Sequence, residues 1–153
     1  MTSNNPSLDL TMHREIALSK ALVWKAWTTP ELLIKWFCPA PWHVEACDID
    51  LRPGGLFRTV FAGPDGQRME NLGCYLSVKH EQELIFTDAL GSDFRPSGTS
   101  FSTVILRLSE HAGVTHYDVR VLHKNEEDRI QHEEMGFESG WNQCLDQLIQ
   151  VMS

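Results

Sequence analysis

The stretch that decides the fold lies at the C-terminal end, from Asn125 to Met152, and reads NEEDRIQHEEMGFESGWNQCLDQLIQVM. Its large apolar residues are three, four or seven positions apart, which places them on one side of an α-helix; they are Ile130, Phe137, Trp141, Leu145, Leu148 and Met152. An unbroken helix over residues 126–152 would be about 40 Å long at roughly 1.5 Å per residue. Its apolar side requires one large surface to pack against.

The segment before this helix supplies that surface, because almost everything between residues 43 and 123 reads as β-strands. Apolar and polar residues alternate, and the intervening turns contain glycine, proline and aspartate; the expected strands cover residues 44–51, 56–61, 69–79, 83–89, 99–108 and 114–123. Residues 91–98 read as an exposed loop. Strands joined by short turns pair antiparallel, so we predict a single antiparallel sheet.

The N-terminal part contributes one strand and two short helices. Residues 8–16 read as the first strand, Ser19 as the N-cap of one helix, and Thr29 followed by Pro30 as the start of another. The predicted fold class is therefore α+β, with a curved antiparallel sheet around a long C-terminal helix and two short helices between strands one and two. We expect a single domain over residues 8–153 after a disordered tail at residues 1–7.

Charge and composition exclude several classes of protein. The formal net charge is −8, which argues against binding to nucleic acid or to anionic membrane surfaces. No apolar run approaches the roughly 20 residues of a membrane span. The first residues lack the basic and apolar regions of a signal peptide, so a cytoplasmic location is expected, as a monomer or weak homodimer.

The cysteine and histidine spacings predict no metal site and no disulfide, and a small binding module is expected to need no cofactor. Cys38, His43 and Cys47 fit no established zinc pattern, and two prolines stiffen the loop between them. A nucleophilic pair of Cys38 and His43 would need an orienting group and an oxyanion site that the sequence does not reveal. No catalytic residue is therefore predicted.

The aromatic residues predict an internal cavity. They are too bulky to fill the space between a curved sheet and one helix without gaps, which makes this space the expected binding site of an apolar, aromatic or lipid-like molecule. The candidate cavity residues are Trp36, Phe57, Tyr75, Phe86, Asp88, Phe101, Tyr117, His123, Met135 and Trp141. The largest internal pocket is expected to touch Trp141 or Met135 on the helix and at least two of Trp36, Phe57, Tyr75, Phe86 and Phe101.

Two further features of the cavity stay open at this point. Glu70 and Asp88 either point inward, with Arg58 or His123 as partner, or project to solvent. Gly136 and Gly140 each weaken a helix by about 1 kcal/mol relative to alanine. They bring the helix close to the sheet or leave room for a ligand beside Trp141.

Six segments in this order resemble the bacterial proteins related to the activator of the heat-shock protein 90 ATPase, of the START-like (SRPBCC, helix-grip) superfamily. They are residues 23–33, 36–39, 50–58, 63–66, 84–88 and 140–148, in full VWKAWTTPELL, WFCP, DLRPGGLFR, GPDG, LIFTD and GWNQCLDQL. The resemblance implies a seven-stranded antiparallel sheet around the C-terminal helix, with a cavity between them. This fold carries many activities. The leading hypothesis is small-molecule binding; the alternatives are a chaperone-interaction module and a cyclase or dehydratase that uses the same cavity.

Overall fold

The computed structural model describes residues 4–153, and its main feature is one seven-stranded antiparallel sheet with the strand order β1-β9-β8-β5-β4-β3-β2. The strands are β1 (Asp9–Ile16), β2 (His43–Ile49), β3 (Leu56–Ala62), β4 (Arg68–Lys79), β5 (Glu83–Thr87), β8 (Thr103–His111) and β9 (Val114–Leu122). The helices are α1 (Lys20–Thr28), α2 (Pro30–Leu33), α3 (Glu126–Glu134) and α4 (Phe137–Met152). The predicted fold class is thereby confirmed.

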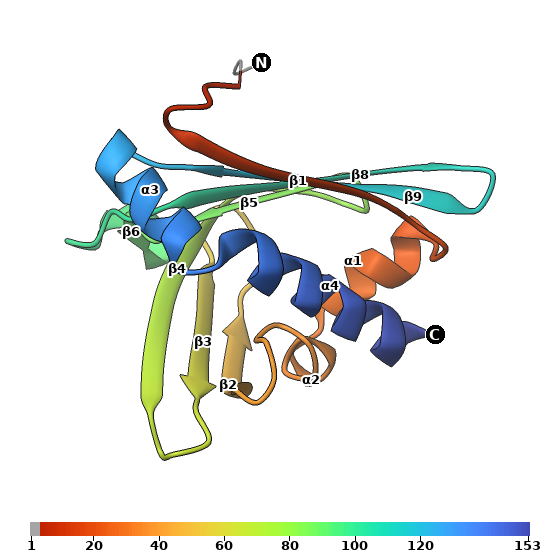
Figure 1. Ribbon diagram of the computed structural model, residues 1–153, viewed down its shortest axis with the longest axis horizontal. Coiled ribbons are helices and arrows are strands. Elements are labelled where there is room, and N and C mark those ends of the chain that lie inside the picture. Colours follow the sequence, from red (N-terminus) through yellow and green to blue (C-terminus); the bar gives the residue numbers. More distant parts are fainter. Residues whose placement is uncertain (1–3) are drawn as a thin grey trace.

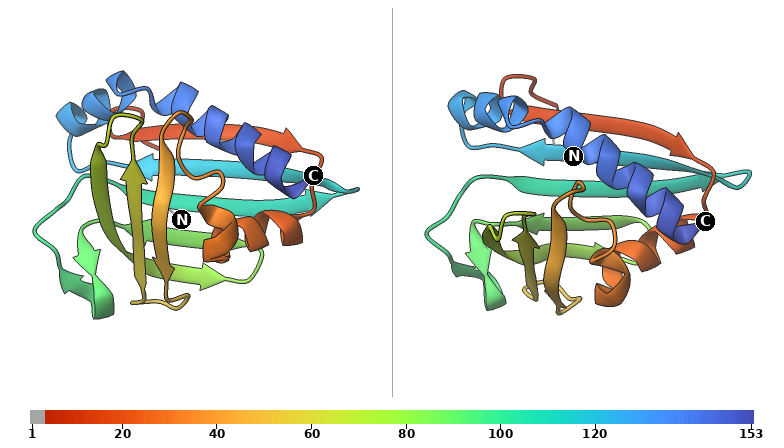
Figure 2. Two further views of the ribbon diagram at one scale, coloured as in Figure 1. Left: turned by 90° about the horizontal axis from the view of Figure 1, so that it is seen from below. Right: turned by 60° about the horizontal axis from the view of Figure 1, so that its bottom comes forward.

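The sheet bends so that its two halves face each other across α4. Strands β1, β8 and β9 run side by side, while β2, β3 and β4 turn steeply away from them, and α4 lies in the angle between the two groups (Figure 1). Views from other directions show α4 crossing the strands diagonally, with α1 and α2 beside its C-terminal part (Figure 2). Register shifts in β2, between Val44 and Ala46, and in β4, between Tyr75 and Ser77, add the local twist that such a bend requires.

The short helices form where the sequence places their caps. The Ser19 side chain accepts a hydrogen bond from the backbone N–H of Leu22 (3.2 Å), and Pro30 occupies the first turn of α2. Helix α1 buries Val23, Trp24, Ala26 and Trp27 in the core. Helix α1 contacts α4 and β8, so these side chains fill the space between α4 and the sheet.

The C-terminal helix is interrupted, and the prediction of one continuous helix over residues 126–152 is wrong. Gly136 adopts a left-handed conformation with φ of +94°, which ends α3 and starts α4. Glycine takes this conformation without the steric cost that a Cβ imposes. Helix α3 buries no residue, and Ile130, which belonged to the expected apolar stripe, is exposed. The helix that packs into the sheet is thus α4 alone.

This break predicts opposite effects for two glycines four residues apart. Gly136→Ala is expected to lower the free energy of unfolding by about 1–2 kcal/mol, because an L-residue is strained in the left-handed region. Gly140→Ala is expected to raise it by about 0.5–1 kcal/mol, because this glycine lies inside α4 and a Cβ there would meet only Pro39 Cγ at 3.8 Å. Urea titration measures both. A stabilising Gly136→Ala would show that α3 and α4 are continuous in solution.

Two other expectations are modified in detail. The predicted loop at 91–98 contains a small hairpin of β6 (Leu90–Gly91) and β7 (Arg95–Pro96) around a 3₁₀ turn at Ser92–Phe94. The expected tail at residues 1–7 lies outside the described residues at 1–3. In the remainder, the backbone N–H of Asn5 donates to Asp9 (2.8 Å), which closes a turn before β1. No helix among residues 4–153 is long and apolar enough to cross a membrane.

Candidate functional site

Two adjoining clefts lie between the α3–α4 junction and the sheet. Their volumes are about 340 and 240 Å³, and both are lined by Phe37, Phe61, His132, Met135 and Trp141. We call the two together the central cleft. The larger part extends over β3, β4 and β5, and the smaller part reaches toward Trp36 and Tyr117. The α3–α4 break therefore forms part of the boundary of the cleft.

Aromatic rings form the wall of the central cleft. Phe37 stands at its centre, with ring centroids 5.2 Å from Trp27, 5.7 Å from Phe57 and 6.1 Å from Phe61. Phe57 in turn packs edge-on against Phe86 at 4.9 Å. Such edge-to-face contacts hold rings in fixed orientations. The wall is therefore apolar, and its rings hold one another in place.

The sheet side of the cleft is partly polar. Thr59 and Asn71 are neighbours across β3 and β4, and the Asn71 side-chain amide donates to the Thr59 hydroxyl (3.3 Å). At the edge, one carboxylate oxygen of Asp88 accepts the backbone N–H groups of Phe101 (2.9 Å) and Ser102 (3.2 Å). Asp88 thus anchors the segment before β8, and it is the one of the two uncertain carboxylates that lines the cleft.

Glu70, in contrast, points to the outer side of the sheet and forms an ion pair there with Arg58. Its carboxylate lies 2.8 Å from the guanidinium of Arg58, which also contacts Asp48 at 2.8 Å. Both carboxylates are more than half exposed. Such an exposed arrangement contributes little to stability and gives Glu70 no part in the cleft.

Two histidines form a directed hydrogen-bond chain at the α3 end of the cleft. Nδ1 of His123 lies 2.8 Å from the carbonyl oxygen of Leu8, so Nδ1 must carry the hydrogen that it donates. Nε2 of neutral His123 is then an acceptor, and Nδ1 of His132, 2.9 Å away, donates to it. The remaining nitrogen of neutral His132, Nε2, carries a lone pair.

The surroundings of His132 favour this neutral form. Burial, followed by the neighbouring His123, lowers the pKa of His132 to about 4. Its ring packs against Phe101 and Phe137 at 5.1 and 5.4 Å. At neutral pH His132 is therefore an uncharged hydrogen-bond acceptor at a mainly aromatic cleft.

The structure brings most of the predicted cavity residues together. Phe57, Phe86, Asp88, Phe101, Met135 and Trp141 line the larger part, and Trp36, Tyr117, Met135 and Trp141 line the smaller part. His123 lies behind His132, at a separate depression beside Asp88 and Phe101. Tyr75 belongs to the buried core and lines neither part.

Sequence reasoning missed Phe37, Phe61, Thr59, Asn71 and His132. Phe61 and Thr59 could have been found, because they alternate with Phe57 on one face of the same strand. His132 could not, since its place depends on how α3 is turned against the sheet.

The central cleft is not the largest depression among the described residues. The largest depression, about 790 Å³, is a groove between β1 and the first turn of α4, lined partly by His13, Glu133 and Asn142, and it touches neither Trp141 nor Met135. Arg14 spans from β1 to Asp146 of α4 (2.8 Å) in this region. Its guanidinium also donates to the backbone carbonyl of Asn142 (3.4 Å), a residue that lines the groove.

Tyr75 carries a buried hydroxyl that has no hydrogen-bond partner among the described residues. Burial raises the pKa of this phenol. The buried hydroxyl of Tyr117, in contrast, accepts a hydrogen bond from Nε1 of Trp27 (3.0 Å). Both tyrosines therefore bury a phenolic hydroxyl, but only that of Tyr117 has a hydrogen-bond partner among the described residues.

This contrast predicts a difference between two conservative substitutions. Tyr75→Phe is expected to leave the free energy of unfolding unchanged or to raise it by up to about 1 kcal/mol, because an unpaired polar group leaves the core. Tyr117→Phe is expected to lower it by about 1–2 kcal/mol, because the indole N–H of Trp27 loses its acceptor. Thermal and urea unfolding of both variants give the comparison. Equal losses in the two would show that Tyr75 has a partner in solution.

The four cysteines are free thiols, and three of them are unsuited to nucleophilic chemistry at neutral pH. Burial raises the pKa of Cys38 and of Cys47 to about 11, and that of Cys144 to about 12. The thiolate is the reactive form of cysteine, and it is scarce at these pKa values.

Solved structures with the same fold cover nearly the whole chain. A crystal structure of a protein from Nitrosomonas europaea is 41% identical over 97% of this chain and 96% of its own, with a TM-score of 0.94. A protein from Mycobacterium smegmatis is 25% identical over 99% of this chain and 94% of its own, with a TM-score of 0.81. An AHSA1-like protein from Aeromonas hydrophila, 19% identical, shares the fold with a TM-score of 0.65 over 93% of this chain and 91% of its own.

The sequence also matches a family model over residues 17–153, which begins at the end of β1 and includes α1, α2 and the whole C-terminal region. No curated protein matches the sequence. The match covers all the elements that form the central cleft and confirms the resemblance noted from the six sequence segments. The chain therefore belongs to the family of Activator of Hsp90 ATPase homolog 1-like proteins.

Proposed function

We propose that the protein binds a small apolar or aromatic molecule in the central cleft. The observation that carries this proposal is that two clefts meet at Trp141 and Phe37 and are walled by aromatic rings. Pockets for small ligands are concave and mainly apolar, with few polar groups that set orientation. Here Thr59, Asn71 and His132 are those polar groups. They favour a ligand with an apolar body and at least one hydroxyl or N–H group, which would donate a hydrogen bond to Nε2 of His132.

The same observations favour binding over catalysis. A general base works best when its pKa lies near the operating pH, and the pKa of His132 is about 4. Asp88 uses a carboxylate oxygen to hold backbone N–H groups. We therefore propose a ligand-binding module and not an enzyme.

A chaperone-interaction module is the second candidate. The specific observation is a pair of exposed methionines at the cleft, in which Met69 is 51% and Met135 66% exposed. Flexible methionines on a surface suit a protein partner as well as a ligand entrance. The family name points to the ATPase of heat-shock protein 90 as the partner to test.

Native mass spectrometry of protein purified from its own host tests the main proposal. A bound molecule that survives gentle desolvation and is absent from a His132→Phe variant supports a ligand in the cleft. A matched Gln150→Ala variant, on the exposed side of α4, should retain the molecule. The opposite outcome is a protein that binds neither a host molecule nor a neutral aromatic probe. If that protein also stimulates the chaperone ATPase, and a Met135 variant does not, the second candidate is supported and ligand binding is rejected.

A further inference from the structure

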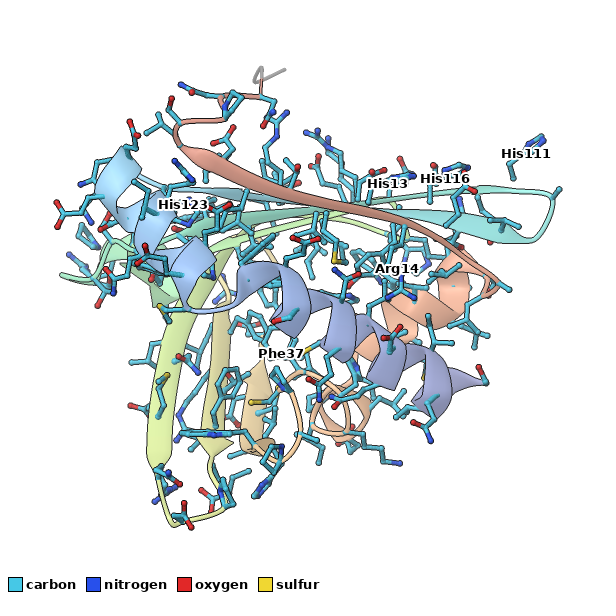
Figure 3. All side chains as sticks on the ribbon, viewed as in Figure 1. His13, Arg14, Phe37, His111, His116 and His123 are labelled. Carbon is cyan, nitrogen blue, oxygen red and sulfur yellow. The ribbon has the colours of Figure 1, made fainter. Side chains whose placement is uncertain are left out.

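A cluster of four polar side chains lies on the outer face of the sheet, on the side away from α4. His13 and Glu15 alternate along β1, and His116 and Asp118 alternate along β9. The antiparallel register places His13 opposite Asp118 and Glu15 opposite His116. Figure 3 shows His13 and His116 on one side of β1 and Arg14 on the other, toward α4. The cluster is therefore separate from the central cleft.

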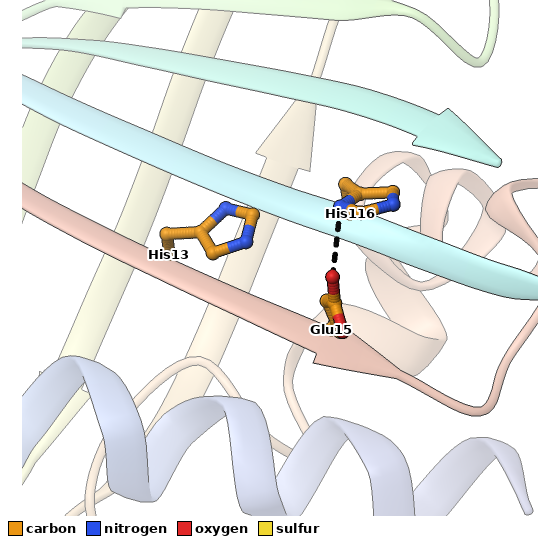
Figure 4. Close-up of side chains that lie close together, drawn as sticks. All are labelled: His13, Glu15 and His116. Carbon is orange, nitrogen blue, oxygen red and sulfur yellow. Dashed lines mark ion pairs between the residues drawn. The ribbon is translucent and has the colours of Figure 1, made fainter. Parts of the chain in front are cut away.

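The side chains of this cluster are close enough to share one ion. One ligand atom each from His13, Glu15 and His116 lies within 4.8 Å of the others. The two imidazole rings have centroids 5.7 Å apart, and the ring of His13 points toward the other two side chains (Figure 4). Ligands about 2.1 Å from a tetrahedral zinc ion lie roughly 3.4 Å from each other. Small rotations of these exposed side chains are enough to reach that spacing.

Asp118 orients the first histidine. Its carboxylate oxygen lies 2.5 Å from Nδ1 of His13, which leaves Nε2 of His13 as the nitrogen for an ion. A carboxylate on the far nitrogen of a histidine ligand is a recurrent feature of zinc sites, where it fixes the tautomer and the ring orientation. His116 lies 3.5 Å from Glu15 and can turn one nitrogen into the same space.

The charges nearby permit a cation. Glu15 and Asp118 contribute two carboxylates, and the chain carries a net charge of −8. Arg107 and Arg120 lie on the same face as the cluster. The guanidinium of Arg107 is paired with Glu83 at 3.1 Å, so that carboxylate offsets its charge. Without an ion, the four groups form two exposed histidine–carboxylate pairs, which contribute little to stability. An ion could replace these pairs with little loss of stability.

We propose that His13, Glu15 and His116 form a surface site for a divalent transition-metal ion of the zinc type, with Asp118 as a positioning residue. Two imidazole nitrogens and one carboxylate oxygen suit Zn²⁺, and a water molecule completes four-coordination. The backbone hydrogen bonds between β1 and β9 fix the spacing of the four side chains. Zinc sites that bind a further molecule through the metal also have three protein ligands and one position open to water or to that molecule.

Zinc titration of the full chain, after treatment with a chelator, tests the proposal. Calorimetry is expected to show one Zn²⁺ per chain in the wild type. His13→Gln and His116→Gln should each abolish or strongly weaken binding, and Asp118→Asn should weaken it by about 10-fold. His111→Gln, at the exposed tip of the β8–β9 hairpin, is the matched control and should bind as the wild type does (Figure 3). At a hundred times its Kd, zinc should raise the Tm of the wild type by about 5–10 °C.

Cobalt binding separates this site from the thiols. Co²⁺ bound to nitrogen and oxygen ligands gives weak visible bands without the intense near-ultraviolet band of a thiolate–cobalt bond. The proposal stands if the wild type shows the weak visible bands alone and the double variant His13→Gln/His116→Gln shows no cobalt band at all. It is overturned by a thiolate band, by binding that persists in the double variant, or by a wild type that binds zinc no better than that variant. Circular dichroism of the metal-free variants verifies that they are folded.

Discussion

Replacement of Trp27 by alanine is expected to lower the free energy of unfolding by about 4–5 kcal/mol. The indole is fully buried and contacts the rings of Trp36, Phe37 and Trp141 at 5.0, 5.2 and 6.3 Å. Removal of a buried tryptophan typically costs about 3–5 kcal/mol, and here the hydroxyl of Tyr117 also loses its donor. Because total stability is usually about 5–15 kcal/mol, the variant should be close to unfolding. Urea titration followed by circular dichroism measures the loss.

The control for this prediction is on the same helix. Leu22 is 37% exposed on the other side of α1, and Leu22→Ala should cost less than about 1 kcal/mol. If the two variants lost the same stability, Trp27 would not be the centre of the aromatic cluster, and the position of α1 would need revision.

Trp141→Ala is expected to lower the affinity for a neutral aromatic probe by at least about 10-fold, which corresponds to about 1.4 kcal/mol. Trp141 is half-buried, stacks on Trp27 at 6.3 Å with a 27° angle between the rings, and lines both parts of the central cleft. Its removal takes away a stacking surface for the ligand. The loss of stability should be about 1–3 kcal/mol, less than for Trp27, because part of the ring already faces open space.

Probe fluorescence and urea titration together decide the role of Trp141. Gln150→Ala, on the exposed side of the same helix, should change neither quantity. Unchanged probe affinity in Trp141→Ala would place the ligand elsewhere and remove the main support for the proposed function. A loss of stability as large as that of Trp27→Ala, with no change in affinity, would make Trp141 a core residue only.

Much of the fold is readable in the sequence because local signals agree with tertiary packing. Alternating apolar residues mark the strands, and Ser19 and Pro30 mark the starts of the first two helices. The break at Gly136 was missed because the apolar spacing continues from Ile130 across it to Phe137. A glycine inside a periodic segment is compatible with a continuous helix and also with a helix end at which the glycine has a positive φ. Only the tertiary contacts of the following turn decide between the two.

The candidate site was partly predictable for a related reason. Phe57, Phe86 and Trp141 follow from strand and helix periodicity, which determines the face on which a side chain lies. The side-chain partners do not follow from it. Glu70 and Asp88 lie on opposite sides of the sheet, and His123 meets His132 only because α3 folds back over the end of β9. The cluster at His13 and His116 likewise depends on the register between two strands far apart in sequence.

That same pairing of β1 with β9 has a consequence for how the chain folds. The backbone N–H of His123 bonds to the carbonyl oxygen of Leu8, and these two residues are 115 positions apart. Closing so long a loop is slow, and antiparallel proteins dominated by distant contacts fold in milliseconds to seconds. At a synthesis rate of roughly 5–20 residues per second, β1 waits on the order of 6–20 s for its partner strand. During translation, the backbone edge of β1 that pairs with β9 therefore has no partner strand until β9 has been synthesised.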